Sequence, residues 1–129
     1  MDHLTLAPGE LITKVLLPKS LAGSPSRYEK ARIRGSIDFP LAGVAVRLKM
    51  NNNKVKDFAI SLTGVNPIPI VIKGTDRNIG NVLDDTALDE IRNNVRKQAK
   101  PMKTTTVAPW YRRRVIGALA RKLSLELSK

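Results

Sequence analysis

Two stretches of small and branched apolar residues flank three consecutive asparagines, and this pattern constrains the fold more than any other feature of the chain. Residues 41–50 and 55–65 both have the composition of β-strands, and Asn51–Asn53 separate them. Asparagine tolerates the left-handed backbone conformation that tight hairpin turns require. The pattern therefore predicts an antiparallel hairpin. Because side chains alternate along a strand, one face of the second strand should carry a set of large apolar residues. These are Phe58, Ile60 and Leu62.

Further extended segments are predicted on both sides of this hairpin. Residues 10–17 are rich in branched aliphatic side chains and stop at Pro18, which predicts a strand. Residues 19–26 combine glycine, proline and several serines, which is typical of a loop, and we expect this loop to be mobile. Residues 27–33 alternate polar and apolar side chains, as a half-exposed strand does. The apolar run at 70–72 is compatible with a short extended segment.

Helical patterns occupy the rest of the chain. A short helix is predicted over residues 76–83, and a longer one runs to about Ala99 with Asp85 or Thr86 as its cap. Pro109 suits the first turn of a last helix that ends near Leu127, and Thr104–Thr106 offer capping hydroxyls before it. Two apolar stripes follow helical spacing. They are Leu88, Ile91 and Val95, and then Ile116, Leu119, Ala120, Leu123 and Leu127.

Strands that come first and helices that come last predict an α+β fold. We expect a two-layer sandwich, in which an antiparallel sheet of three to four strands is followed by about three helices. At 129 residues the chain has the length of a single domain. Residues 1–26 would form a lead-in strand and mobile loop, residues 27–72 the sheet and residues 73–129 the helical layer.

Positive charge is concentrated at one end of the chain. The net charge is +12, and residues 92–129 contain eleven Lys and Arg against one acidic residue, a net of +10. Such a region can meet a phosphate backbone, an acidic protein or an anionic cofactor. Arg112, Arg113 and Arg114 form its densest cluster, with Trp110 and Tyr111 beside it. Because the predicted strands lack an aromatic platform for nucleic-acid bases, we favour a solvated or partner-binding surface over a nucleic-acid site.

No set of residues in the sequence matches a catalytic or metal site. The chain has no cysteine and one histidine, His3, which lies at a terminus and is expected to be structurally idle. The acidic pairs Asp84–Asp85 and Asp89–Glu90 lie where a helix begins, which favours capping over acid–base chemistry. The glycines form no phosphate-binding motif. We expect a non-catalytic chain with no membrane span, because no apolar run approaches about 18 residues.

Several segments in order resemble a known family. They are Glu10-Leu11-Ile12 to Pro18, Tyr28-Glu29-Lys30, Arg34, Asp38, the strand Ala42 to Val46, Thr63-Gly64-Val65, Pro67 to Pro69 and Tyr111-Arg112-Arg113. This succession resembles the C-terminal domain of the FAD-binding subunit of molybdenum hydroxylases, the group of xanthine dehydrogenase, carbon monoxide dehydrogenase and 4-hydroxybenzoyl-CoA reductase. The resemblance implies the same sandwich fold. It also implies an oxidoreductase complex in which the flavin subunit transfers electrons.

The resemblance carries two residues over as cofactor contacts. Lys30 matches a lysine that approaches the flavin, where a cation would stabilise the negative charge of the reduced ring. Ile12 matches an apolar residue that contacts the cofactor. The two preceding lobes, which hold most of FAD, have no counterpart in this sequence, so we expect little or no FAD affinity in the chain alone. Without the resemblance, Lys30 would be interpreted as an exposed strand lysine and Ile12 as ordinary core.

The resemblance also implies partners. These are the flavin-binding lobes, the iron–sulfur subunit and the molybdenum subunit of one cytoplasmic complex, and Arg112, Arg113 and Arg114 would serve as a partner or anion-binding surface. The alternative is a small basic nucleic-acid-binding protein that uses the arginine-rich last helix. Its signature would be binding that weakens steeply with salt.

Overall fold

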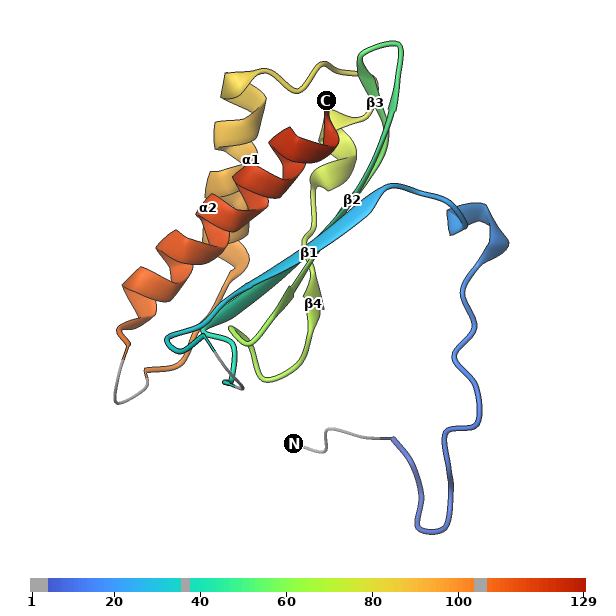
Figure 1. Cartoon of the computed structure of the whole chain (residues 1–129), viewed down its shortest axis with the longest axis vertical. Coiled ribbons are helices and arrows are strands. Elements are labelled where there is room, and N and C mark those ends of the chain that lie inside the picture. The colour runs from blue at the N-terminus through green and yellow to red at the C-terminus, as the bar shows by residue number, and fades with distance from the viewer. Residues whose placement is uncertain (1–4, 36–37, 104–106) are drawn as a thin grey trace.

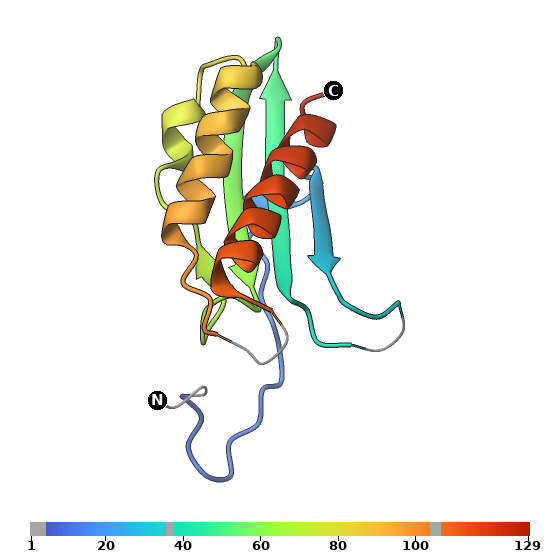
Figure 2. The same cartoon turned by 90° about the vertical axis from the view of Figure 1, so that its left-hand side faces the viewer.

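A computed structural model describes residues 5–35, 38–103 and 107–129, and shows an antiparallel sheet with two helices on one face (Figures 1 and 2). The α-helices are α1 (Asp85–Gln98) and α2 (Pro109–Leu127), and η1 (Lys19–Leu21) and η2 (Thr75–Asn78) are short 3-10 helices. The strands are β1 (Ser26–Ala31), β2 (Ala42–Asn51), β3 (Lys54–Thr63) and β4 (Ile70–Val71). The predicted α+β sandwich is confirmed.

The sheet follows chain order, β1-β2-β3-β4, and each neighbouring pair is antiparallel. The predicted hairpin between β2 and β3 is confirmed. Asn52 and Asn53 have φ angles of 48° and 61°, the left-handed values that this tight turn requires. The helix-facing side of the hairpin is apolar as expected, because Ile60 and Leu62 are 0% exposed and Phe58 is 4% exposed.

The two α-helices lie close to their predicted bounds. The predicted cap of α1 was one or two residues too late, because Asp84 precedes the helix and its Oδ1 accepts a hydrogen bond from the Ala87 amide at 2.8 Å. Helix α2 runs from Pro109 to Leu127, as predicted. The expected short helix at 76–83 is instead the single 3-10 turn η2. It ends before Gly80, whose φ of 85° is incompatible with a continuing right-handed helix.

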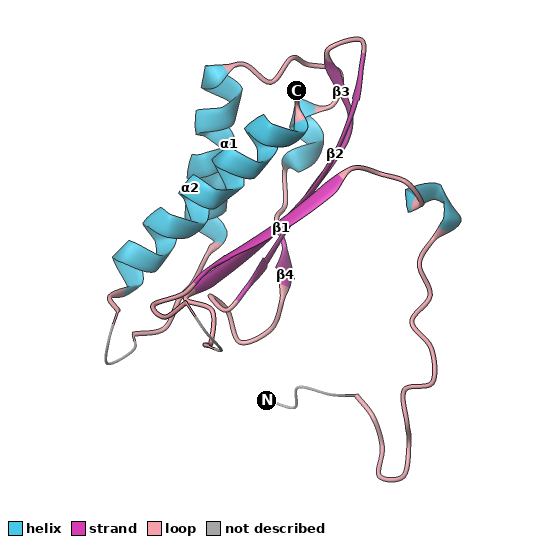
Figure 3. Ribbon diagram, viewed as in Figure 1, coloured by secondary structure: helices cyan, strands magenta, loops and turns pink. Residues whose placement is uncertain are grey.

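The core lies between the sheet and the helices (Figure 3). Side chains alternate along β2 and β3, so one face of each strand meets α1 and α2 while the other remains uncovered. The buried apolar residues of this layer come from every part of the sandwich. They are Ala42, Val44, Val46, Leu48, Val55, Phe58, Ile60, Leu62, Val65, Ile72, Leu83, Leu88, Ile91, Val95, Ala99, Ile116, Ala120 and Leu123.

The strand predicted over residues 10–17 is wrong. Residues 10–17 have no regular secondary structure, and the segment runs away from the sandwich (Figure 1). Leu11, Val15, Leu16 and Leu17 are each more than 80% exposed. A strand needs a neighbour to accept and donate its backbone hydrogen bonds, and no strand of the described chain pairs with this segment. The residues that follow include η1, so the predicted loop at 19–26 contains one helical turn.

Two predictions fall outside the described residues. They concern His3 and the capping hydroxyls of Thr104–Thr106. Among the helices that the structure describes, none combines the length and the apolar character that crossing a membrane would require.

Candidate functional site

Lys30 lies on the face of the sheet that the helices leave open. It pairs with Gly43 in the β1–β2 ladder, while its neighbour Glu29 pairs with Val44. The carboxylate of Glu29 accepts a hydrogen bond from Lys122 Nζ on α2 at 2.8 Å, so Glu29 points toward the helical layer. Because adjacent side chains of a strand point to opposite faces, Lys30 points away from the helices. Its ammonium group is exposed and has no hydrogen bond or ion pair among the described residues.

Tyr28 accompanies Lys30 on this open face. Its ring lies across Gly43, because a Cβ atom at that glycine would come within 2.8 Å of the tyrosine Oη and would also collide with Thr63 Oγ1. Gly43 therefore lets the aromatic ring lie close to the strand backbone. Tyr28 keeps 55% of its surface exposed, so the ring also presents a face to any group that docks on the sheet.

The middle of the open face is built from small side chains. Ala45, Ala59 and Ser61 occupy neighbouring ladder positions on β2 and β3, and Val71 of β4 lies opposite Ser61. These residues line a shallow hollow of about 150 Å³. An ion pair between Arg47 and Asp57 lies on the same face, with Nε and Oδ2 2.9 Å apart. The result is a flat surface of small side chains, with Lys30 and Tyr28 on the strand at one edge of the sheet.

Ile12 does not join this surface. It is 67% exposed and belongs to the segment at 5–17, which lies well apart from β1 (Figure 1). The structure thus separates the two residues that the resemblance assigned to one cofactor.

Arg112 lies in the interior rather than on the predicted arginine surface. Its side chain is buried, with 7% of the residue exposed. Nε donates to the Leu41 carbonyl at 2.8 Å, Nη1 donates to the Met102 carbonyl at 3.1 Å, and Nη2 donates to the Gly64 carbonyl. These carbonyls belong to three different loops at one end of the sandwich. Arg112 therefore ties these loops together, and burial lowers the pKa of its guanidinium from the ordinary value.

The spacing of residues along α2 indicates that Arg112 is buried. Arg112 precedes Ile116 by four residues, so both lie on the same side of α2, and Ile116 is fully buried. Its two neighbours in the cluster remain exposed. Arg113 donates from Nε to the Ala99 carbonyl at 3.3 Å, while Arg114 has no partner among the described residues.

Several other basic residues of the second half form ion pairs with acidic residues at the surface of the sandwich. Arg121 contacts Asp85 and Asp89 at 2.6 and 2.9 Å, and Lys122 contacts Glu29. Glu29 raises the pKa of Lys122 by accepting its hydrogen bond. This pairing reduces the positive charge that is free to meet a polyanion. Among the described residues, no group of three or more histidine or acidic side chains could hold a metal ion.

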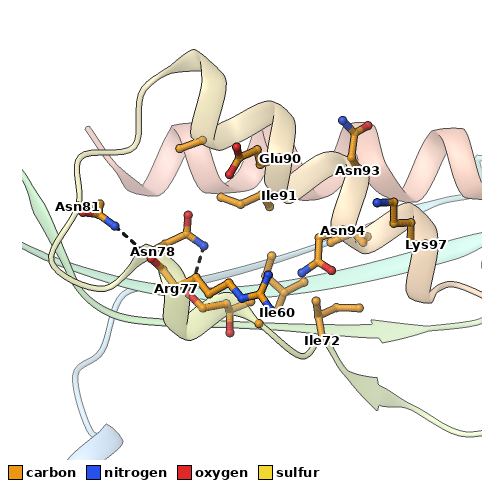
Figure 4. A pocket seen from close by; sticks show the side chains of 14 residues that line it. Ile60, Ile72, Arg77, Asn78, Asn81, Glu90, Ile91, Asn93, Asn94 and Lys97 are labelled. Carbon is orange, nitrogen blue, oxygen red and sulfur yellow. Dashed lines mark hydrogen bonds between the residues drawn. The ribbon is translucent and has the colours of Figure 1, made fainter.

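A second concave feature lies between η2 and α1 (Figure 4). It is a cleft of about 530 Å³, and none of the site residues predicted from the sequence lines it.

Comparison with known proteins places this fold in a family. Residues 26–127 match the family described as the CO dehydrogenase flavoprotein C-terminal domain. The chain belongs to this family. The resemblance to flavoprotein subunits of molybdenum hydroxylases, predicted from the order of its motifs, is confirmed at the level of the family.

Two curated relatives are medium chains. The glyceraldehyde dehydrogenase medium chain of Sulfolobus acidocaldarius is 31% identical over 121 residues, which cover 93% of this chain and 42% of that protein. The carbon monoxide dehydrogenase medium chain of Afipia carboxidovorans is 29% identical over 118 residues, which cover 91% of this chain and 41% of that protein. The chain thus spans about two-fifths of the length of these relatives.

Solved structures with the same fold support the family assignment. A crystal structure of the Cu,Mo-CO dehydrogenase in its cyanide-inactivated form superposes with a TM-score of 0.75 at 25% identity, and the match covers 82% of this chain and 37% of that one. Quinoline 2-oxidoreductase from Pseudomonas putida 86 has the same TM-score at 17% identity, which shows the fold alone.

Proposed function

We propose that this domain acts as a non-catalytic part of a molybdenum hydroxylase-type oxidoreductase, in which it presents Lys30 to the FAD held by separate flavin-binding lobes. The observation that carries the proposal is the ammonium of Lys30, which has no partner among the described residues and lies beside a patch of small side chains on the fold of a flavoprotein C-terminal domain. An isoalloxazine ring is planar, so the patch of small side chains at Ala45, Ala59 and Ser61 fits it.

The chain's own contribution is electrostatic and steric. FAD, when bound, supplies the ring that accepts and passes on electrons. The ammonium of Lys30 would place a positive charge where negative charge accumulates on reduction. The open face would exclude water from one side of the ring. Gly43 lets the Tyr28 ring lie close to the strand backbone, and this ring borders the same area. No residue of the described chain forms a pyrophosphate-binding turn, so FAD would depend on the other lobes.

Lys30→Met tests this role in a complex reconstituted with the flavin-binding lobes of a relative. Methionine keeps the length of the side chain and removes its charge. We expect the flavin reduction potential to fall by about 30 mV or more, the equivalent of a tenfold change for a two-electron couple. Lys49→Met is the matched control, because Lys49 is an exposed lysine at the far end of β2. An unchanged potential in Lys30→Met, or an equal shift in the control, would contradict the proposal.

We also propose that residues 5–17 dock on those flavin-binding lobes. The segment combines large exposed apolar side chains with a backbone that has no strand partner in the described chain. Pairing with the edge of a neighbouring sheet would satisfy both features at once. The Sulfolobus match covers more of the chain than residues 26–127, and so includes part of the segment before β1.

A paired substitution separates docking from folding. Leu16→Asp combined with Leu17→Asp should abolish co-purification of the chain with the flavin-binding lobes and leave its own unfolding midpoint unchanged. Val82→Asp, another exposed apolar position, serves as the control and should co-purify normally. Normal co-purification of the Leu16–Leu17 variant would exclude the segment from the interface.

The proposed place of this domain in a molybdenum hydroxylase-type complex also suggests contacts with the iron–sulfur and molybdenum subunits. Arg113 and Arg114 are exposed and would dock on an acidic face of the iron–sulfur or molybdenum subunit. Charge reversal of both residues should weaken assembly most strongly at low salt, because exposed charges are screened as ionic strength rises. A cytoplasmic location of that complex stays a prediction, as does the alternative of nucleic-acid binding. The latter would require salt-dependent binding that depends on Arg113 and Arg114.

A further inference from the structure

The cleft between η2 and α1 has the dimensions of a ligand site. Its volume of about 530 Å³ lies within the range of roughly 300–1,000 Å³ that small-molecule sites occupy. It opens at the β3–β4 side of the sheet, among residues of η2, α1 and β3. Lys30 lies on the opposite edge strand and points to the opposite face, so the cleft is separate from the proposed flavin surface.

The floor of the cleft is apolar. Ile60 of β3, Ile72 after β4, and Ile91 and Val95 of α1 line it, and each is no more than 4% exposed. Their branched side chains belong to the packed core, so the floor is fixed rather than adaptable. Because these side chains are packed into the core, they present a small apolar contact area that a flat group can meet without rearranging the sandwich.

Hydrogen bonds hold both walls of the cleft in place. Asn94 and Gln98 on α1 both donate to the Lys73 carbonyl at 2.9 Å, and Gln98 Oε1 accepts from the Lys73 amide at 3.0 Å. On the other wall, backbone hydrogen bonds connect Val55 with Asn81 and Gly80 at 2.9 and 2.8 Å. Both walls are therefore positioned before any ligand arrives, which lowers the entropic cost of binding.

Two cationic side chains lie on these walls. Arg77 comes from η2 and Lys97 from α1, and Figure 4 shows both at the cleft together with Glu90. Within the residues that the structure describes, neither the guanidinium nor the ammonium forms a hydrogen bond or an ion pair. Glu90 is the one carboxylate among the described lining residues. The cleft thus carries an excess of positive charge that the fold does not neutralise.

We propose that this cleft binds a small organic anion, whose apolar body covers the isoleucine floor and whose phosphate or carboxylate head meets Arg77 and Lys97. An arginine suits such heads because its planar fork can donate two parallel hydrogen bonds. Asn78, also on η2, donates from Nδ2 to the Thr75 carbonyl at 3.2 Å, and its Oδ1 can accept a hydrogen bond from the ligand (Figure 4).

An NMR titration of the isotopically labelled 129-residue chain tests the proposal with four probes. Naphthyl phosphate and naphthoate carry the two possible heads on one body, naphthamide is their uncharged match, and inorganic phosphate is a head without a body. We expect at least one of the two anions to shift the amide signals of Gly74 and Asn94 and to bind at least about tenfold more tightly than naphthamide or inorganic phosphate. The tighter of the two anions identifies the head.

Variants make the test specific. Arg77→Gln and Lys97→Gln should each weaken the tighter anion by about tenfold, because each removes one charge-assisted contact. Lys54→Gln, at the exposed first residue of β3, should leave binding unchanged. Both cleft positions are exposed, so the variants should keep the wild-type spectrum elsewhere. The proposal is overturned if neither anion binds, if naphthamide binds as tightly, if the shifts map to another surface, or if both variants bind normally.

Discussion

Two aliphatic stretches of this chain have similar composition, but one is buried in the sheet and the other is exposed. Residues 42–51 form β2, one of the two inner strands of the sheet, where Val44 is 0% exposed. Residues 10–17 form no element, and Leu16 is 85% exposed. The difference is that β2 has a strand on each side and helix α2 over one face, whereas no strand of the described chain pairs with the first stretch. Branched aliphatic composition therefore indicates side chains that favour burial. Whether they are buried within this chain depends on the elements that pack beside them.

The largest expected effect separates the two regions directly. Ile60→Ala removes a fully buried side chain from the sandwich and leaves a cavity, which should lower the free energy of unfolding by about 2–5 kcal/mol. Leu16→Ala should change it by less than about 0.5 kcal/mol, because the side chain is already in water. Urea denaturation of the isolated chain measures both. A comparable loss in Leu16→Ala would show that residues 10–17 pack on the sandwich in solution.

The second expected effect concerns the loops at one end of the sandwich. Arg112→Ala removes a buried guanidinium and leaves the Leu41, Gly64 and Met102 carbonyls without this donor. We expect a loss of about 2–3 kcal/mol in the free energy of unfolding, because hydrogen bonds to charged groups are strong. Arg114→Ala, two residues further along α2, should cost less than about 0.5 kcal/mol. Equal effects would mean that Arg112 is an ordinary surface residue.

A smaller effect on stability is expected at the N-terminal cap of α1. Asp84→Ala removes the side-chain acceptor for the Ala87 amide at the start of α1 and should cost about 1 kcal/mol. Asp76→Ala is the control, because the Asp76 side chain has no such bond among the described residues. Thermal unfolding monitored by circular dichroism distinguishes them. If both variants melt together with the wild type, the cap contributes nothing.

The smallest effect lies at β1, where the exposed segment joins the sandwich. Glu29 raises the pKa of Lys122 above its ordinary value of about 10.5, so the folded protein holds this proton more tightly than the unfolded chain. The contribution to stability is full below pH 10.5 and is lost as the pH rises through the folded-state pKa. Glu29→Gln should therefore be slightly less stable than the wild type at pH 8, and the difference should narrow above pH 10.5. If the difference in stability between Glu29→Gln and the wild type stayed constant across this pH range, it would arise from packing and not from the ion pair.

Local patterns predicted most of the sandwich. The asparagine turn, the alternation along β3 and the spacing of Ile116, Ala120 and Leu123 depend on neighbouring residues in the chain, and each of these predictions is confirmed. The predicted short helix at 76–83 is a single turn, and the cap of α1 lies at Asp84. Both errors concern element ends, where one glycine conformation or one side-chain bond decides the outcome.

The sites were less accessible to sequence reasoning. A run of three arginines indicates a charged surface, yet the helical phase places Arg112 against the core and leaves its two neighbours exposed. The anion cleft combines η2, which ends at Asn78, with α1, which begins at Asp85, and no sequence motif indicates it. Which face Lys30 occupies depends on the register of β1 against β2.

By itself the sequence determined the hairpin, the two helices and the order of strands before helices, because turn residues and apolar periodicity act over a few positions. Only the tertiary structure decided which apolar stretch is buried, which arginine holds the loops together and which cations remain unpaired. These outcomes depend on groups that are distant in the chain. Burial and pairing are properties of the assembled layers, so no short segment can specify them.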